Sequence, residues 1–94
     1  MLYIIDCVDK PGSAAVRSAN RAEHLAYLEA LGDRLHAAGP TLSEDGQSMT
    51  GSLLIIDFAD RAEAEGFCAG DPYAKAGLFQ SVTIRPWRRV LPRG

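Results

Sequence analysis

The sequence predicts an α+β domain with a ferredoxin-like antiparallel sheet. Two observations predict it. Short apolar segments alternate with amphipathic ones in the order β-α-β-β-α-β. The chain has 94 residues, which is enough for one domain but not for two, so 1–94 is expected to be a single domain. This order is typical of a split βαβ sheet with both helices on one face.

The first half is expected to contain two strands and a long helix between them. Residues 2–8 are apolar and β-rich, and the turn-forming segment 9–12 ends them. Ser18 or Asn20 is a candidate cap for a helix that runs to about Ala38, where Gly39-Pro40 is typical of a helix end. The short segment 41–43 is then the second strand.

The second half begins with a hairpin loop at 44–48 and continues with the clearest strand, over 51–58. Asp60 is expected to cap a helix over 61–69. Asp71-Pro72 begins a short helix to about Gly77, with Asp at the cap and Pro in the first turn. The last strand runs from 79 to 90, and Pro86 indicates a bulge or an edge position in it.

Composition excludes several classes of function. Ten basic and twelve acidic residues give a net charge of −2, which disfavours nucleic-acid binding. No apolar run approaches the roughly 20 residues that span a membrane, and the start of the chain is unlike a signal peptide. Two cysteines without metal-binding spacing favour free thiols in a reduced, cytoplasmic protein. No motif for a metal or a cofactor is found, so neither is expected.

Both faces of the predicted sheet are apolar. In the strand over 51–58, alternate positions on both sides carry Leu, Ile or Phe, and the first strand shows the same pattern. Two helices on one side cover only one of these faces. A second copy of the chain is the economical cover for the other, which predicts a homodimer. The alternative is that the last strand or the tail folds over it.

The first helix carries an unusual inner face. Leu28, Leu31 and Leu35 form an apolar stripe, which Arg17, Arg21 and His24 continue towards the N-terminus, while His36 falls on the solvent side. Buried charges are costly unless they are paired or hydrated, so the pattern predicts a polar cavity under this half of the helix. Alternatively, His24 is a hydrogen-bonded core residue, and the arginines extend towards solvent.

Asp71 is a candidate partner for His24. Its position before Pro72 is fully explained by helix capping. A carboxylate has two oxygens, however, so one can cap the helix while the other meets an imidazole and fixes its tautomer. We therefore expect Asp71 to face the same cavity as His24.

Five segments of the sequence together resemble the YciI-like, or YCII-related, family. They are residues 17–25, 38–40, 51–53, 71–77 and 82–87. The resemblance implies a dimeric ferredoxin-like fold of the α/β barrel type, akin to that of muconolactone isomerases. It also implies an active-site His–Asp pair, which matches His24 and Asp71. Most members of the family have no assigned reaction, and one relative in chloroaromatic degradation is a dehydrochlorinase.

Two functions remain open at this point. In the first, the chain is a lyase or isomerase in which His24 acts as a general acid/base and Asp71 orients it. Arg17 and Arg21 would then hold a small anionic molecule, with Ser52 and Tyr73 as further substrate-binding residues. In the second, the same pocket belongs to a non-catalytic ligand-binding or interaction module.

Overall fold

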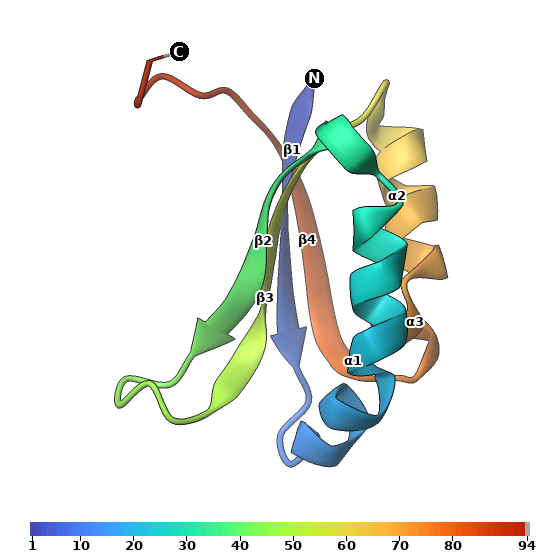
Figure 1. Cartoon of the computed structure of the whole chain (residues 1–94), viewed down its shortest axis with the longest axis vertical. Coiled ribbons are helices and arrows are strands. Elements are labelled where there is room, and N and C mark those ends of the chain that lie inside the picture. The colour runs from blue at the N-terminus through green and yellow to red at the C-terminus, as the bar shows by residue number, and fades with distance from the viewer. Residues whose placement is uncertain (94) are drawn as a thin grey trace.

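A computed structural model describes residues 1–93, which form one four-stranded sheet with helices along one side (Figure 1). The elements in chain order are β1 (Leu2–Asp9), α1 (Ala14–Glu29), a 3-10 turn (Gly32–Arg34), β2 (Leu35–Leu42), β3 (Met49–Asp57), α2 (Arg61–Gly70), α3 (Pro72–Lys75) and β4 (Phe79–Trp87). The strand order is β2-β3-β1-β4, and every neighbouring pair is antiparallel. The predicted βαββαβ ferredoxin-like fold is therefore confirmed.

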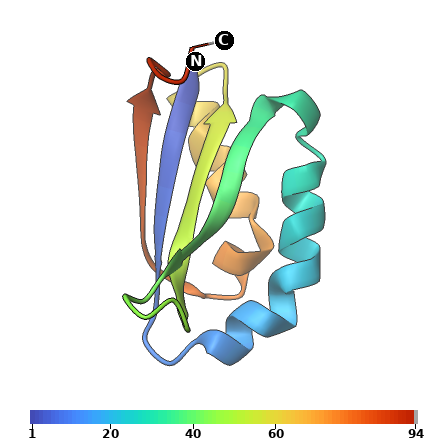
Figure 2. The same ribbon diagram turned by 60° about the vertical axis from the view of Figure 1, so that its left-hand side comes forward.

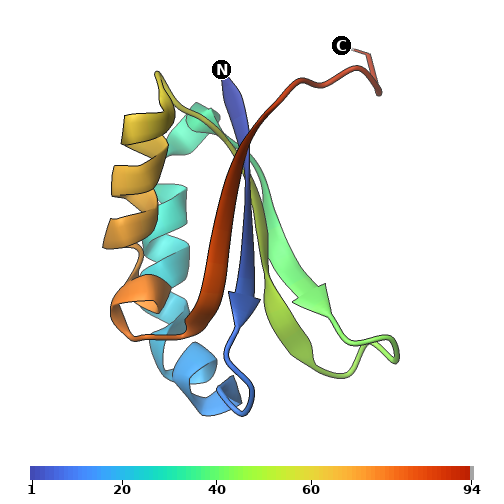
Figure 3. The ribbon, with the colours of Figure 1, turned by 180° about the vertical axis from the view of Figure 1, so that it is seen from behind.

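The helices all lie on the same side of the sheet. Figures 1 and 3 show the sheet from its two edges, with α1, α2 and α3 on one side and no element on the other. Figure 2 shows the four strands side by side, with α2 behind them. We call the two sides of the sheet the covered face and the bare face.

The first helix differs from its prediction at both ends. It begins after Ser13, upstream of the expected caps, and it ends at Glu29 instead of about Ala38. Gly32 then reverses the chain with a φ of +59°, a conformation that costs glycine little. Leu31 and Leu35 still pack against the core, but they do so from the turn and the next strand. The chain therefore turns to form contacts between elements, although the spacing of the leucines by itself continues the pattern of a helix.

The second strand is much longer than the predicted segment 41–43. It runs from Leu35 to Leu42, so Gly39-Pro40 lies inside a strand and does not end a helix. Pro40 is tolerated there because β2 is an edge strand, where a missing backbone N–H leaves no neighbour unpaired. His36 is exposed as expected, although it lies on this strand and not on a helix.

The second half follows its prediction closely. Asp60 caps α2 by accepting a hydrogen bond from the Glu63 backbone N–H at 2.9 Å. Asp71 caps α3 in the same way, by accepting from the Tyr73 backbone N–H at 2.9 Å. The last strand ends at Trp87, shorter than expected, and Pro86 lies on this edge strand as predicted.

The hydrophobic core lies between the covered face and the helices. Its buried residues on the strands are Tyr3, Ile5, Cys7, Leu54 and Ile56, and Phe58 directly after β3 is buried with them. Their neighbours along each strand point to the bare face, where Val8 and Leu53 remain 43% and 41% exposed. The helices thus bury one apolar face and leave the second one open. Within residues 1–93, no helix is long and apolar enough to cross a membrane.

Candidate active site

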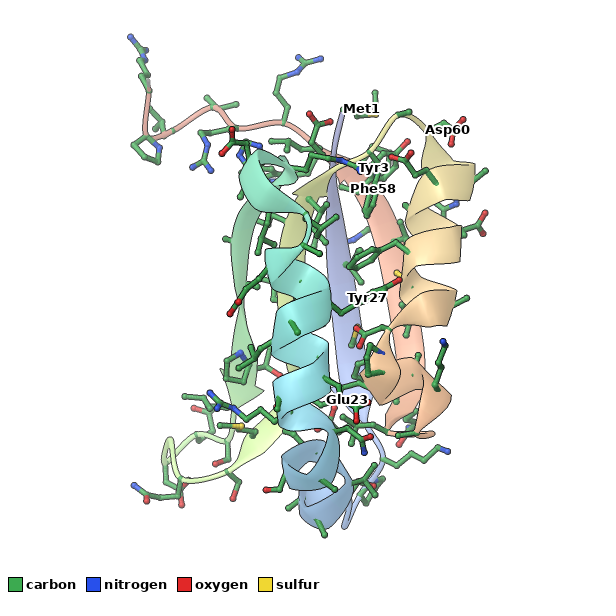
Figure 4. All side chains as sticks on the ribbon, turned by 45° about the vertical axis from the view of Figure 1, so that its right-hand side comes forward. Met1, Tyr3, Glu23, Tyr27, Phe58 and Asp60 are labelled. Atoms are coloured by element: carbon green, nitrogen blue, oxygen red, sulfur yellow. The ribbon has the colours of Figure 1, made fainter. Side chains whose placement is uncertain are left out.

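The inner face of α1 places His24 at the centre of a polar cluster. His24 is buried, and Leu28 follows it one turn later on the same face. Glu23, labelled in Figure 4, marks this turn of the helix. The predicted change from an apolar to a polar inner face therefore exists, and it occurs between these two turns of α1.

Asp71 meets His24 from the loop between α2 and α3. His24 Nδ1 lies 2.8 Å from Asp71 Oδ1, and both side chains are more than nine-tenths buried. The same Oδ1 accepts the Tyr73 backbone N–H that caps α3. The predicted contact between His24 and Asp71 is confirmed, although one carboxylate oxygen serves both partners where two were expected.

This contact determines which nitrogen of His24 is available. Nδ1 is engaged by Asp71, and no buried side-chain nitrogen or oxygen within residues 1–93 lacks a hydrogen-bond partner. Nε2 has no protein partner in that part of the chain, so it is accessible from the cavity that His24 lines. An ionised carboxylate beside Nδ1 favours the tautomer with its proton on Nδ1, which leaves the Nε2 lone pair free.

Tyr73 fixes the plane of the imidazole. The two rings stack at a centroid distance of 3.8 Å and an interplanar angle of 12°. Tyr73 is 1% exposed, and its ring also makes an edge-on contact with Phe79 at 6.0 Å. Burial raises the pKa of Tyr73, and the charges of Arg17 and Arg21 oppose that rise. Tyr73 therefore keeps its hydroxyl proton at neutral pH.

Arg17 is buried, and its side chain donates several hydrogen bonds within the chain. Its Nε and Nη2 atoms donate to the two carboxylate oxygens of Asp9, at 2.8 and 2.9 Å. Nη2 also donates to the Gly51 carbonyl and to Ser52 Oγ, both at 2.9 Å. Burial alone would lower the pKa of Arg17, but its hydrogen bonds to Asp9 and the charge of that carboxylate raise it.

Asp9 therefore balances the charge of Arg17 within the protein, and Arg17 also lines the cavity described below, where the sequence led us to expect an anion or water. Asp9 was predicted only as part of a turn. The signal that could have identified it is general, because a buried arginine requires a carboxylate, and Asp9 ends the strand that leads into α1.

Gly51, whose carbonyl accepts a hydrogen bond from Arg17, is part of the same arrangement. A Cβ at this position would lie 2.0 Å from the Cys7 carbonyl oxygen, so the close approach of β1 and β3 requires glycine here.

A cavity of about 180 Å³ opens between α1, β2 and β3. All the predicted site residues except Asp71 line it, namely Arg17, Arg21, His24, Ser52 and Tyr73. The sequence reasoning missed its apolar part, which consists of Leu25, Leu28, Ala38, Gly39, Pro40, Met49 and Leu54. That part comes largely from β2 and β3, whose packing against α1 depends on the correct course of β2.

Arg21 differs from Arg17 in its surroundings. It is exposed at the edge of the cavity, and no carboxylate of residues 1–93 forms an ion pair with it. Arg21 is therefore the cation that can meet a negative charge entering the cavity.

Over residues 1–93, no three His, Cys, Asp or Glu side chains are grouped in a way that could hold a metal ion. Cys7 and Cys68 are free thiols, as predicted.

This chain is similar to known proteins in both sequence and structure. Protein YciI of Escherichia coli O6:H1 is 36% identical over 96% of this chain and 99% of its own length. A 5-chloro-2-hydroxyhydroquinone dehydrochlorinase of Burkholderia phenoliruptrix, solved with 2,5-dihydroxybenzoquinone, is 42% identical with a TM-score of 0.86 and covers 94% of each chain. An antibiotic biosynthesis monooxygenase shares the fold alone, at 16% identity and a TM-score of 0.57, over 96% of this chain and 99% of that one.

The family model for the YCII-related domain matches residues 1–88, which include every residue of the site described above. The YciI relative is similar over nearly its entire length, so the likeness covers the whole fold and not a single motif. The chain belongs to the YCII-related domain family, as its sequence pattern had indicated.

Proposed function

We propose that this chain is an acid/base enzyme that acts on a small anionic organic molecule, as an isomerase or as a lyase of the dehydrochlorinase type. The observation that carries the proposal is the buried contact of His24 Nδ1 with Asp71 at 2.8 Å. This contact fixes the imidazole and leaves Nε2 as the basic atom at the cavity. A histidine held in this way by a carboxylate is a common general acid/base.

The proposed reaction needs only proton transfer at His24. Nε2 accepts a proton from the substrate, and the neighbouring carboxylate of Asp71 stabilises the resulting imidazolium. The imidazolium then returns the proton at another atom, or loses it to water after a leaving group has departed. Stacking on Tyr73 keeps the ring in one orientation through both steps.

The cavity suits a molecule of about one ring with a negative charge. Its volume of about 180 Å³ is below the ~300–1,000 Å³ that is typical of sites for larger ligands. Arg21 provides a cation that no protein carboxylate neutralises in the described chain. The similar dehydrochlorinase was solved with 2,5-dihydroxybenzoquinone, a single ring, which supports this choice of substrate class.

The direct test is release of chloride from 5-chloro-2-hydroxyhydroquinone, the compound in the name of the similar enzyme. We expect turnover by the unaltered chain and its loss in His24→Ala. Tyr3→Phe is the matched control, because Tyr3 lies beside Phe58 near the end of the sheet marked by Met1 (Figure 4) and does not line the cavity.

A second measurement addresses other substrates and the non-catalytic alternative. Protein purified without added ligand is analysed by mass spectrometry for bound small molecules. A bound molecule that the chain converts, in a step that needs His24, supports the enzyme. Two results together contradict the enzyme proposal and favour the ligand-binding module. They are a molecule that stays bound and unchanged, and equal chloride release by His24→Ala and the unaltered chain.

We also propose that two copies of the chain associate through the bare face. Val8 and Leu53 are exposed on that face, and Ile4 and Ile55 are only half-buried there. A contiguous apolar surface of this kind is typical of an interface. The segment after β4 crosses to the same side of the sheet (Figure 1) and exposes Val90 to 71%, so it does not cover the strands.

Light scattering tests the association. We expect twice the mass of one chain at micromolar concentration, and a single-chain mass for Ile4→Asp, which places an unpaired charge on the bare face. Ser18→Ala, at an exposed position of α1, is the control and should keep the mass of the unaltered protein. A single-chain mass for the unaltered protein would contradict the proposal.

A further inference from the structure

The hydroxyl group of Tyr27 forms the one hydrogen bond that joins α1 to α2 within residues 1–93. It donates to the backbone carbonyl of Phe67 at 2.8 Å. The two rings also stack, with their centroids 4.6 Å apart and an interplanar angle of 26°. Figure 4 shows Tyr27 reaching from α1 towards α2. Burial raises the pKa of Tyr27, and the charge of Asp71 raises it further, so the hydroxyl keeps the proton that it donates.

The Phe67 carbonyl has no backbone donor because the chain leaves the helix at Asp71. In a continuous α-helix, the carbonyl of residue 67 accepts from the N–H of residue 71. The Asp71 N–H instead donates to the Cys68 carbonyl at 3.3 Å, while the Asp71 carboxylate contacts His24. Tyr27 therefore supplies the missing donor at the turn that directs this carboxylate to the imidazole.

Gly70, the residue before Asp71, lies against the same hydroxyl. A Cβ at this position would lie 2.6 Å from the Tyr27 hydroxyl oxygen, too close for both atoms to keep their places. The φ of Gly70 is not positive, so glycine is required here by space and not by backbone conformation. A Cβ on Gly66, one turn earlier on α2, would meet no atom within 4 Å. The requirement for glycine is therefore local to the contact with Tyr27.

The first helix holds the end of α2 at two points. Tyr27 follows His24 by three residues on α1, so the two side chains are neighbours on one side of the helix. His24 contacts the Asp71 carboxylate at 2.8 Å, and Tyr27 contacts the Phe67 carbonyl at the same distance. One contact alone would let the end of α2 pivot about it, and the second contact removes that freedom.

We propose that Tyr27 is a positioning residue, whose hydroxyl holds the end of α2 so that Asp71 stays at Nδ1 of His24, and that Gly70 provides the space for it. The inference rests on the proposed function, in which Asp71 orients His24. Tyr27 does not line the cavity, so it acts through Asp71 and not on a substrate. A displacement of about 1 Å in a catalytic group is enough to slow a reaction by up to ~100-fold, which gives such a residue a measurable role.

The tautomer of the His24 ring, measured from its ring-nitrogen NMR signals, tests the proposal. In the unaltered chain we expect the proton on Nδ1, beside Asp71. Tyr27→Phe keeps the ring that stacks on Phe67 and removes only the hydroxyl. We expect it to lower the fraction of His24 with the proton on Nδ1, because the carboxylate that favours this tautomer is no longer held in place. The exposed His36 is the internal reference and should give the same signals in both proteins.

Turnover of 5-chloro-2-hydroxyhydroquinone is the second readout for Tyr27→Phe. We expect kcat to fall by about tenfold or more, because the base is less well oriented. KM should stay within about twofold of that of the unaltered chain, because Tyr27 does not line the cavity.

Gly70→Ala tests the same contact from the other side. Its Cβ displaces the Tyr27 hydroxyl, so we expect the same change in the His24 tautomer, although alanine favours a helix more than glycine does. Gly66→Ala is the matched control and should leave the tautomer unchanged. In the double variant Tyr27→Phe/Gly70→Ala, the added Cβ lies 3.5 Å from the ring carbon Cζ, which is an ordinary contact. The double variant should therefore behave like Tyr27→Phe alone.

The outcomes separate this inference from the proposed function. An unchanged His24 tautomer in Tyr27→Phe overturns the inference, and so does a double variant whose change is the sum of the two single changes. Loss of chloride release in His24→Ala would in that case leave the acid/base proposal standing. Conversely, a tautomer that changes in Tyr27→Phe and Gly70→Ala but not in Gly66→Ala supports the positioning role. It does so even where the unaltered chain releases no chloride, a result that counts against the proposed function alone.

Discussion

The two faces of the sheet are similar in sequence and opposite in environment. On β1, Tyr3, Ile5 and Cys7 point to the covered face and are at most 5% exposed, whereas Val8 on the bare face is 43% exposed. The covered face also receives Arg17, which finds its carboxylate within the chain. The bare face carries Asp6, for which no ion pair forms in residues 1–93.

Apolar character alone therefore does not determine which side of a strand becomes core. Both sides of β1 and β3 are apolar, and the helices cover the side on which their own polar groups can also be paired. Within one chain the covered face is buried, and residues of the bare face remain exposed. Four substitutions or conditions test whether the two faces differ in this way.

An acidic residue on the covered face should have the largest effect. Ile5 is 1% exposed, and Ile5→Asp would bury a carboxylate without a partner. We expect a loss of about 5 kcal/mol or more in the free energy of unfolding, which is close to the whole stability of a small domain. Urea denaturation followed by circular dichroism measures it.

Ile4→Asp, one residue away on the bare face, is the control for this substitution. Ile4 is only half-buried, so a charge there stays close to water and should cost about 1–2 kcal/mol at low protein concentration. Equal losses for the two variants would mean that the two faces do not differ in the way described.

The ion pair of Arg17 and Asp9 should come next. Asp9→Asn leaves the buried guanidinium without a counter-charge and is expected to cost about 3–5 kcal/mol. The double variant Asp9→Leu/Arg17→Met removes both charges and should recover part of that loss, because neither buried charge is then left unpaired. A double variant no more stable than Asp9→Asn would assign the loss to packing instead of charge.

Alkaline pH should destabilise the covered face by a smaller amount. Burial, with a smaller contribution from nearby Cys68, raises the pKa of Cys7 from 9.0 to about 12. Between these values the unfolded chain loses the thiol proton while the folded chain keeps it, so the free energy of unfolding falls as pH rises. The loss at pH 10 is roughly 1 kcal/mol, and it disappears at pH values well below about 9.

Cys7→Ala isolates this contribution. Its free energy of unfolding should be lower at neutral pH, because a buried side chain has been shortened. It should nevertheless fall less steeply than that of the unaltered chain between about pH 8 and pH 10 in urea titrations. Parallel pH profiles for the two proteins would show that the Cys7 thiol does not contribute to the alkaline loss.

Asp71→Asn should have the smallest effect on stability and a large one on turnover. Asparagine caps helices about as well as aspartate, and one oxygen already accepts from both His24 and Tyr73. We expect a change below about 1 kcal/mol in unfolding and a loss of at least about 100-fold in turnover. A stability loss as large as that of Asp9→Asn would indicate that the His24 contact is structural.

Sequence patterns were sufficient to predict the order of the elements, the caps at Asp60 and Asp71, and the polar inner face of α1. These features depend on alternation, capping chemistry and helical period, which are properties of neighbouring residues. The pairing of His24 with Asp71 was an expectation from helix spacing and capping, beside the alternative of a hydrogen-bonded core histidine, and the resemblance to the YCII-related family added to it. The contact joins residues that are far apart in the sequence, and the structure contains it.

Sequence patterns did not predict the end of α1, the course of β2 or the partner of Arg17. Leu31 and Leu35 continue a helical period, yet the chain turns at Gly32 so that β2 can pair with β3. The gain from that pairing is non-local and leaves no trace in the local pattern. Asp9 is a turn residue by sequence, and it becomes the counter-ion of Arg17 because β1 and α1 meet in space. All three features depend on contacts between elements, which local sequence signals do not record.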